Sequence, residues 1–222
     1  MSQVIDKINK LLNEIPPHVK LIPISKTKPE NTILEAYNSG FKIFGENKVQ
    51  ELARKHESLP GDIEWHMVGH LQSNKVKYLA PFVHLLHGID SFKLLKVVNK
   101  EGEKIGRVIN VLLQLHIATE ETKFGLSEEE VFQIFDSEEF KLLENVKVIG
   151  VMGMATYTSD EGLIRKEFKG LSRFYEKIKS EYFIDNKDFK EISMGMSSDY
   201  KIAIEEGSTM IRIGSLIFGS RI

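Results

Sequence analysis

The 222-residue sequence contains no cysteine. This absence excludes disulfide bonds, zinc fingers, thiolate-bound iron–sulfur clusters and cysteine nucleophiles. The sequence also has no run approaching about 18 apolar residues, so we expect no membrane-spanning helix and no membrane partner. The N-terminal residues mix acids and amides with apolar residues and lack the apolar core of a signal peptide. We therefore expect a cytoplasmic protein.

An excess of charge of either sign is also missing. Lys and Arg number 30 against 32 for Asp and Glu, which gives a net charge of −2. Surfaces that bind nucleic acid are usually basic, so this balance predicts no nucleic-acid partner. The hydrophobic share of 41% is enough for a packed core. No linker rich in Pro, Gly or Ser divides the chain, and we expect a single domain over residues 1–222.

Short apolar segments alternate with helical patterns along the chain. The apolar segments cover residues 21–25, 41–45, 63–69, 82–88, 107–115, 146–154, 189–193 and 209–213. This alternation is typical of a parallel sheet covered by helices. Eight such units fit a closed (β/α)8 barrel, the TIM barrel. The alternative is an open doubly wound sheet, which usually has fewer strands.

An extra helix is predicted at the N-terminus. Residues 2–15 carry apolar side chains at the spacing of one helix face, and Pro16 ends the pattern. After the last apolar segment only SLIFGSRI remains, which is too short for a full eighth helix. We expect the N-terminal helix to cover that gap. The predicted fold class is thus α/β, a (β/α)8 barrel with an added N-terminal helix.

Glycines and serines follow the last two predicted strands, in SMGMSSD (residues 193–199) and RIGS (residues 212–215). Barrels of this class carry their functional groups on the loops after the strands, and they often bind phosphate after strands seven and eight. Gly214 permits close backbone approach, while Ser197 and Ser215 supply hydroxyl groups. The pattern indicates a phosphate site, although serines at this place can instead cap the following helix.

Two cationic residues are unusual for their positions. Arg212 shares a strand face with Met210, and it needs an acceptor because a guanidinium keeps its proton. That acceptor is either an acid on a neighbouring strand or a ligand in the barrel mouth. Lys26 directly follows the first strand, on the face of Ile24. If that face points inward, desolvation favours the neutral amine that forms Schiff bases; otherwise Lys26 is an ordinary solvated lysine, as we expect for Lys28.

Pyridoxal 5′-phosphate (PLP) requires three such groups. They are a lysine that binds its aldehyde, donors for its phosphate and an arginine for its ring nitrogen. A metal site is not predicted. His66 and His70 are four residues apart, but they fall in a predicted strand and turn and not on a helix. His84 and His87 are three apart, and no cysteine or acid pattern completes a ligand set.

Seven segments resemble the pyridoxal phosphate homeostasis proteins, a family built like the N-terminal barrel of alanine racemase. In chain order they are SKTKP, FGENKVQE, WHMVGHLQSNK, KFGL, GVMGMA, SMGMSSD and STMIRIGSLIFGSR. They run through nearly the whole chain. The resemblance implies the same barrel and PLP as the cofactor.

The resemblance also assigns roles to single residues. Lys26 of SKTKP would hold PLP as a Schiff base. Ser197 and the backbone of Gly214 and Ser215 would hold the phosphate. Arg212 would face the pyridine nitrogen. The family more often has threonine where this chain has Ser215, and both residues offer a hydroxyl and a backbone N–H.

Three further residues are implied to line the pocket. They are Asn47 of the GEN segment, Met154 and, on a weaker match, His70. The resemblance therefore places residues from six different loops around one cofactor.

A role without catalytic turnover is expected. Related alanine racemases use a second domain that brings a tyrosine base opposite the lysine, and we expect no such domain here because the sequence ends soon after the eighth strand. A racemase needs two acid/base groups, and only Lys26 is assigned. Arg212 would also discourage protonation of the ring nitrogen and weaken the electron sink.

We therefore expect a monomeric PLP-binding protein of vitamin B6 homeostasis, which passes PLP transiently to apoenzymes. The alternatives are a PLP-dependent amino-acid racemase or lyase, with Tyr157 or a histidine as the missing base, and a phosphosugar-metabolising barrel without PLP.

Overall fold

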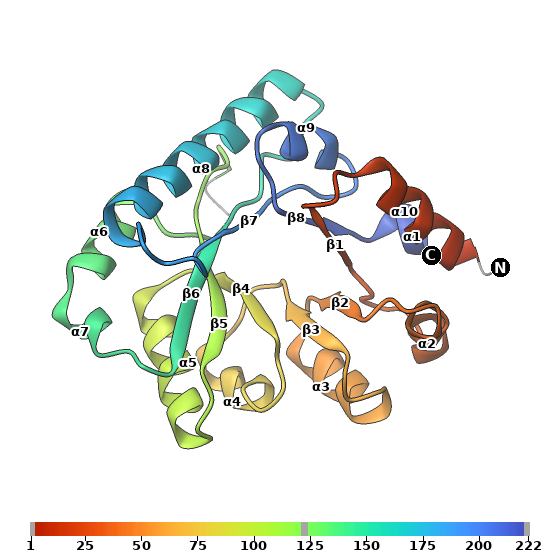
Figure 1. Cartoon of the computed structure of the whole chain (residues 1–222), viewed down its shortest axis with the longest axis horizontal. Helices are drawn as coiled ribbons and strands as arrows, with labels where there is room; N and C mark the ends of the chain where they lie inside the picture. Colours follow the sequence, from red (N-terminus) through yellow and green to blue (C-terminus); the bar gives the residue numbers. More distant parts are fainter. Residues whose placement is uncertain (1–2, 121–123, 220–222) are drawn as a thin grey trace.

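The computed structural model describes residues 3–120 and 124–219, and it is a ring of strands surrounded by helices (Figure 1). Lys123 of the KFGL segment and the last residues of the STMIRIGSLIFGSR segment lie outside the described residues. The strands are β1 (Lys20–Pro23), β2 (Ile43–Glu46), β3 (Glu64–Met67), β4 (Leu85–Ile89), β5 (Ile109–Gln114), β6 (Val146–Met152), β7 (Glu191–Ser193) and β8 (Met210–Ile213).

All strand pairs are parallel, and the sheet runs in the order β1-β8-β7-β6-β5-β4-β3-β2. The ring closes where β1 meets β2. There, Ile24 forms a parallel bridge with Gly45, and the Ser25 N–H donates to the Gly45 carbonyl at 3.0 Å. The predicted (β/α)8 barrel is confirmed, and the open doubly wound alternative is wrong.

The helices lie outside the ring. They are α1 (Gln3–Glu14), α2 (Glu30–Asn38), α3 (Val49–Ser58), the 3₁₀ helix η1 (Ser73–Lys75), α4 (Val76–Leu79), α5 (Phe92–Lys104), α6 (Glu128–Asp136), α7 (Glu138–Lys141), α8 (Glu161–Tyr182), α9 (Tyr200–Glu205) and α10 (Ser215–Phe218). The short α7 was not predicted. Its start is marked by Ser137, whose side chain accepts from the Phe140 N–H. Within residues 3–120 and 124–219, no helix is long and apolar enough to cross a membrane.

The extra N-terminal helix lies where predicted. Helix α1 contacts α10 and α2, so it covers the outside of the barrel beside β8 and β1 (Figure 1). Tyr200 at the start of α9 donates its hydroxyl to Glu14 at 3.3 Å, which ties the end of α1 to the neighbouring helix. The four-residue α10 is too short to cover this place alone.

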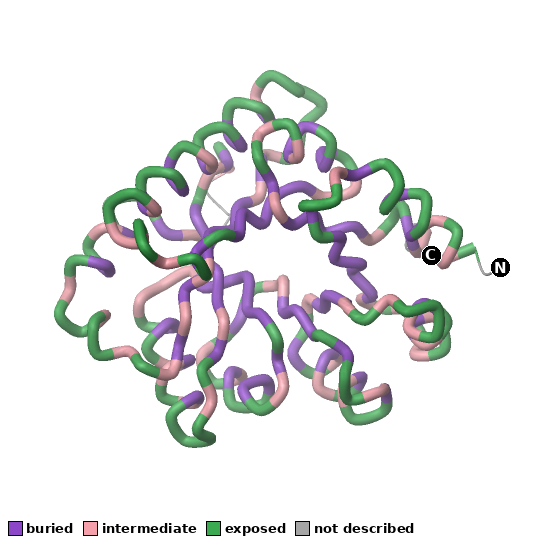
Figure 2. Tube along the Cα trace, viewed as in Figure 1, coloured by how far each residue is buried: buried purple, intermediate pink, exposed green. Residues whose placement is uncertain are grey.

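The core has two parts, one on each side of the strands. The buried residues that fill the barrel are Ile22, Ile24, Leu85, Leu112, Met152 and Met210. The alternate residues, such as Leu21, Ile211 and Ile213, pack outward against the helices. Figure 2 shows the strands buried and the outer faces of the helices exposed. Because Ile22 and Ile24 point inward, the strand face that Lys26 continues is the inner one, as the alternation predicts.

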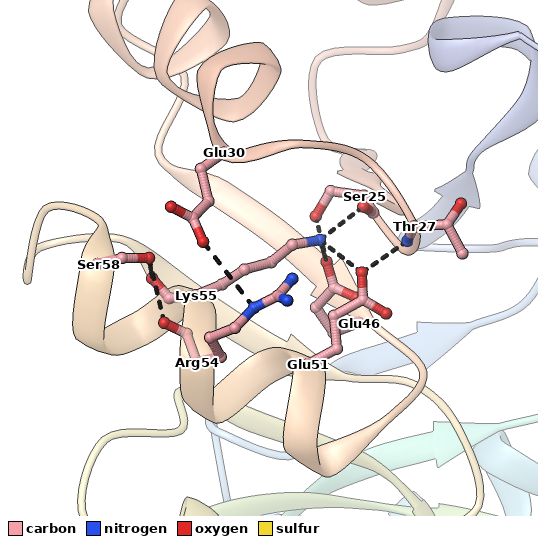
Figure 3. Close-up of polar contacts among 8 residues, drawn as sticks. All are labelled: Ser25, Thr27, Glu30, Glu46, Glu51, Arg54, Lys55 and Ser58. Carbon is pink, nitrogen blue, oxygen red and sulfur yellow. Dashed lines mark hydrogen bonds and ion pairs between the residues drawn. The ribbon is translucent and has the colours of Figure 1, made fainter.

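A buried ion network fixes the loop after β1 (Figure 3). Lys55 of α3 is fully buried, and its ammonium donates to Glu46 Oε1 at 2.7 Å and to Glu51 Oε1 at 2.8 Å. The same ammonium donates to the Ser25 carbonyl at 2.8 Å, and the Ser25 hydroxyl donates to Glu46 at 2.6 Å. Burial raises the pKa of Glu46, although Lys55 and Ser25 oppose the shift.

The network also holds the residue after Lys26. The backbone N–H of Thr27 donates to Glu51 Oε1 at 2.6 Å. Thr27 has a φ of 65°, a left-handed conformation that β-branched residues rarely adopt. Contacts on Ser25 and Thr27 therefore fix the backbone on both sides of Lys26.

Removal of the buried cation is expected to destabilise the barrel. Lys55→Met leaves Glu46 and Glu51 without their cation, so we expect the free energy of unfolding to fall by about 3–5 kcal/mol. Urea denaturation followed by circular dichroism measures the change. Lys96→Met is the control, because Lys96 pairs with Glu139 at the surface and such pairs contribute at most about 1 kcal/mol. Equal losses in the two variants would contradict a structural role for Lys55.

Candidate cofactor site

A cavity of about 510 Å³ opens at the carboxyl ends of the strands. Its size is in the range of small-molecule sites, and its position is that of functional sites in this fold. Of the eight residues that the sequence analysis implied for the site, all but His70 line this cavity: Lys26, Asn47, Met154, Ser197, Arg212, Gly214 and Ser215. The barrel thus brings together residues from the loops after β1, β2, β6, β7 and β8.

Lys26 lies at the end of β1 and is half-buried in the cavity wall. Its position follows from the network around Lys55, which holds Ser25 and Thr27. Lys28 is also half-buried and lines the same cavity. The turn after Ser25 therefore carries both lysines to the cavity, and the expectation that Lys28 is an ordinary solvated lysine stays a prediction.

The loops after β7 and β8 meet at Ser197. Its hydroxyl accepts from the Gly214 N–H at 3.3 Å, so it joins the two loops and does not cap α9. Helix α9 begins at Tyr200, after Asp199. Gly195 has a φ of 94°, and a Cβ there would stand 2.6 Å from that of Ala203, which explains the need for glycine in this loop.

This junction supplies donors for an anion. Ser197 and Ser215 bring hydroxyl groups to the cavity wall, and the first turn of α10 presents backbone N–H groups beside them. Hydroxyl and backbone N–H groups are the donors that proteins use for phosphate. The junction therefore offers donors suited to an anion, and the phosphate site stays a prediction.

Arg212 lies on the inner face of β8 and is 5% exposed. Its Nη1 donates to the Ser193 carbonyl at 2.8 Å and to Ser193 Oγ at 2.6 Å, and its Nη2 donates to the Gly153 carbonyl at 3.1 Å. These acceptors are neutral, and Asp199, in the loop after the neighbouring strand β7, adds a favourable charge interaction with Arg212. Burial lowers the pKa of Arg212 to about 10, which still leaves the guanidinium protonated at neutral pH.

These contacts occupy three of the five N–H donors of Arg212. The side chain also lines the cavity. Because a guanidinium can donate but not accept, it suits a ligand atom with a lone pair, such as an unprotonated ring nitrogen. The cavity therefore combines an amine, a set of anion donors and a guanidinium. This donor set fits a molecule with an aldehyde, a phosphate and a pyridine nitrogen.

His70 is not among the cavity-lining residues of the described chain, contrary to the weak expectation from resemblance. Its Nδ1 lies 2.9 Å from Asp90 Oδ2, and its ring stacks on Phe124. Conversely, Val68 and Phe218 line the cavity without having been predicted. Side chains two residues apart share one face of a strand, so the sequence could have placed Val68 on the same inner face as His66. No sequence signal placed Phe218, because its position depends on the short α10.

Comparisons with known proteins identify the family of the chain. A family model described as the alanine racemase N-terminal domain matches residues 1–222. The pyridoxal phosphate homeostasis protein of Aquifex aeolicus is 40% identical over 226 residues, which cover 100% of this chain and 96% of that protein. The protein of the same name from Helicobacter pylori (strain 26695) is 37% identical, over 98% of this chain and 96% of its own length.

Solved structures show the same relationship. PipY of Synechococcus elongatus, solved without PLP, superposes with a TM-score of 0.91. Its structure with PLP bound gives 0.88. Both are 30% identical to this chain and cover 97% of it and 100% of PipY. The chain belongs to the pyridoxal phosphate homeostasis protein family, and its barrel is that of the alanine racemase N-terminal domain.

Proposed function

We propose that the protein binds PLP in the cavity at the carboxyl ends of the strands and serves intracellular vitamin B6 homeostasis. The observation that carries this proposal is the convergence of Lys26, Ser197 and Arg212 on one cavity. The PLP-bound structure of PipY and the names of the relatives support it. PLP would supply a reactive aldehyde that the protein keeps in a protected, reversible form.

Lys26 is the residue proposed to hold the cofactor. Its amine nitrogen would form a Schiff base with the aldehyde carbon of PLP, and the aldehyde oxygen would leave as water. Ser197, Ser215 and the backbone at Gly214 would bind the phosphate. Arg212 would donate to the pyridine nitrogen, while Asn47 and Met154 would form the remaining walls of the site.

The same residues argue for a carrier and not for an amino-acid enzyme. PLP enzymes that remove an α-proton use the protonated ring nitrogen as part of an electron sink. A guanidinium beside that nitrogen donates to its lone pair and opposes protonation. We propose that the barrel of residues 1–222 works as a monomeric unit and releases PLP transiently to apoenzymes.

The alternative, a racemase or lyase, requires a second acid/base group. Tyr157 lines the cavity and is the named candidate, but it is 87% exposed. An exposed phenol is surrounded by water, which competes with it for protons and leaves it free to rotate. The geometry therefore favours the carrier over the enzyme.

Loss of Lys26 is expected to abolish covalent binding. The Lys26→Ala protein should lack the Schiff-base absorbance that the unmodified protein shows with PLP, and borohydride should fix no cofactor to it. Lys28→Ala is the matched control, because Lys28 lines the same cavity. If the absorbance persists in Lys26→Ala and disappears in Lys28→Ala, the Schiff base forms on Lys28 and the assignment to Lys26 is wrong.

Loss of the Ser197 hydroxyl is expected to weaken binding of the PLP phosphate. A hydrogen bond to a charged group contributes about 1.5–3 kcal/mol, so Ser197→Ala should weaken PLP affinity by roughly 10- to 100-fold. Fluorescence titration with PLP measures the affinity, and pyridoxal without phosphate should show little difference between the two proteins. Ser180→Ala, on the exposed face of α8, should leave both affinities unchanged.

Enzymatic turnover is expected to be absent. The PLP-loaded protein, incubated with a panel of amino acids in deuterated water, should exchange α-protons no faster than free PLP at the same concentration. Nuclear magnetic resonance of the α-proton signals measures the exchange. Exchange well above the free-PLP rate that is lost in Tyr157→Phe would establish the racemase or lyase alternative instead.

A further inference from the structure

A second group of polar side chains lies at the opposite end of the barrel. Glu64 is the first residue of β3, His66 is on the same strand face, and His84 directly precedes β4. One potential ligand atom from each residue lies within 4.8 Å of the other two. His84 Nε2 is 3.5 Å from Glu64 Oε2. Two imidazoles and a carboxylate therefore gather at the amino ends of the strands.

His66 provides an independent sign of a missing partner. Its side chain is 2% exposed, and its Nδ1 lies 2.9 Å from His87 Nε2. Its other nitrogen, Nε2, is buried and has no hydrogen-bond partner among the described residues. Buried nitrogen atoms of this kind almost always have a partner. His66 belongs to one group with His84 and Glu64, so its unpaired Nε2 points to a ligand that all three would share.

The surroundings of His66 suit a metal ligand. Imidazoles that bind a metal usually donate their other N–H to a fixed partner, which orients the ring. Here His66 Nδ1 can donate to His87 Nε2, and His87 Nδ1 can donate in turn to Ser193 Oγ at 2.9 Å. Ser193 Oγ already accepts from Arg212, and a hydroxyl oxygen can accept twice.

The ligand set favours a transition-metal ion. Imidazole and carboxylate ligands suit Zn²⁺, whereas Mg²⁺ and Ca²⁺ prefer oxygen ligands alone. Three protein ligands leave one position for water, as in zinc sites that are open to solvent. Glu64 and His84 have side chains that are both 46% exposed, so an ion could enter from outside. Lys20 is the cation nearby, and its ammonium is paired with Glu191 at 2.5 Å.

We propose that Glu64, His66 and His84 bind Zn²⁺, or a divalent transition-metal ion of similar preference, at the amino end of the barrel. The sequence predicted no metal site, because it offered only histidine pairs close in sequence. The barrel instead brings one histidine from β3 together with one from the start of β4. This site is separate from the PLP cavity and does not depend on the function proposed for that cavity.

Zinc titration of the untagged full-length protein tests the proposal. Isothermal titration calorimetry should show one Zn²⁺ per chain. His84→Gln and Glu64→Gln should each weaken the affinity by at least about tenfold, since even the loss of an outer-shell partner costs that much. Both side chains are exposed, so the variants should unfold at the temperature of the unmodified protein when zinc is absent. His18→Gln, at another exposed histidine, should bind zinc normally.

Two outcomes would overturn the proposal. One is the absence of saturable zinc binding by the unmodified protein. The other is zinc binding that both His84→Gln and Glu64→Gln retain at full affinity, which would place the ion elsewhere. A second measurement guards against a folding artefact: zinc should raise the thermal unfolding midpoint of the unmodified protein and of His18→Gln, but not that of the two ligand variants.

Discussion

The position of the proposed cofactor lysine depends on a buried ammonium that does not itself line the cavity. Lys55 brings together the end of β1, the end of β2 and the first turn of α3 through one nitrogen atom. Burying a charge is costly unless it is paired and hydrogen-bonded, and here two carboxylates and a carbonyl oxygen satisfy it. Glu51, one of these carboxylates, also accepts from the Thr27 N–H and holds Thr27 in a backbone conformation that the loop would rarely adopt alone.

The interior of the barrel is divided between apolar packing and one polar column. Ile22, Leu85 and Met210 fill it from the sides, as in other barrels of this class. Through them runs a line of hydrogen bonds from Arg212 to Ser193, His87 and His66. This column connects the cavity at one end with the proposed metal ligands at the other.

Sequence reasoning reached the fold and the cavity because both depend on local patterns. Alternation placed Ile24 and Lys26 on one strand face, which the barrel turns inward, and the glycines and serines after β7 and β8 indicated a phosphate site. It failed for contacts between distant segments. The spacing of Glu51 and Lys55 predicts only an ordinary ion pair along a helix, because the partners that bury Lys55 lie on β2 and on the loop after β1. Likewise, Glu64, His66 and His84 meet only because β3 and β4 are neighbours.

The junction of β1 and β2 has a further consequence. Backbone contact there includes the isolated bridge between Ile24 and Gly45, and the Lys55 contacts to Ser25 and Glu46 join the same two strand ends. Side-chain contacts therefore join β1 and β2 where the ring closes. Any fluctuation that parts these two strands must also release the backbone around Lys26. Opening of the barrel at this junction would then also weaken cofactor binding. The two changes would be one cooperative event, because both break the same contacts.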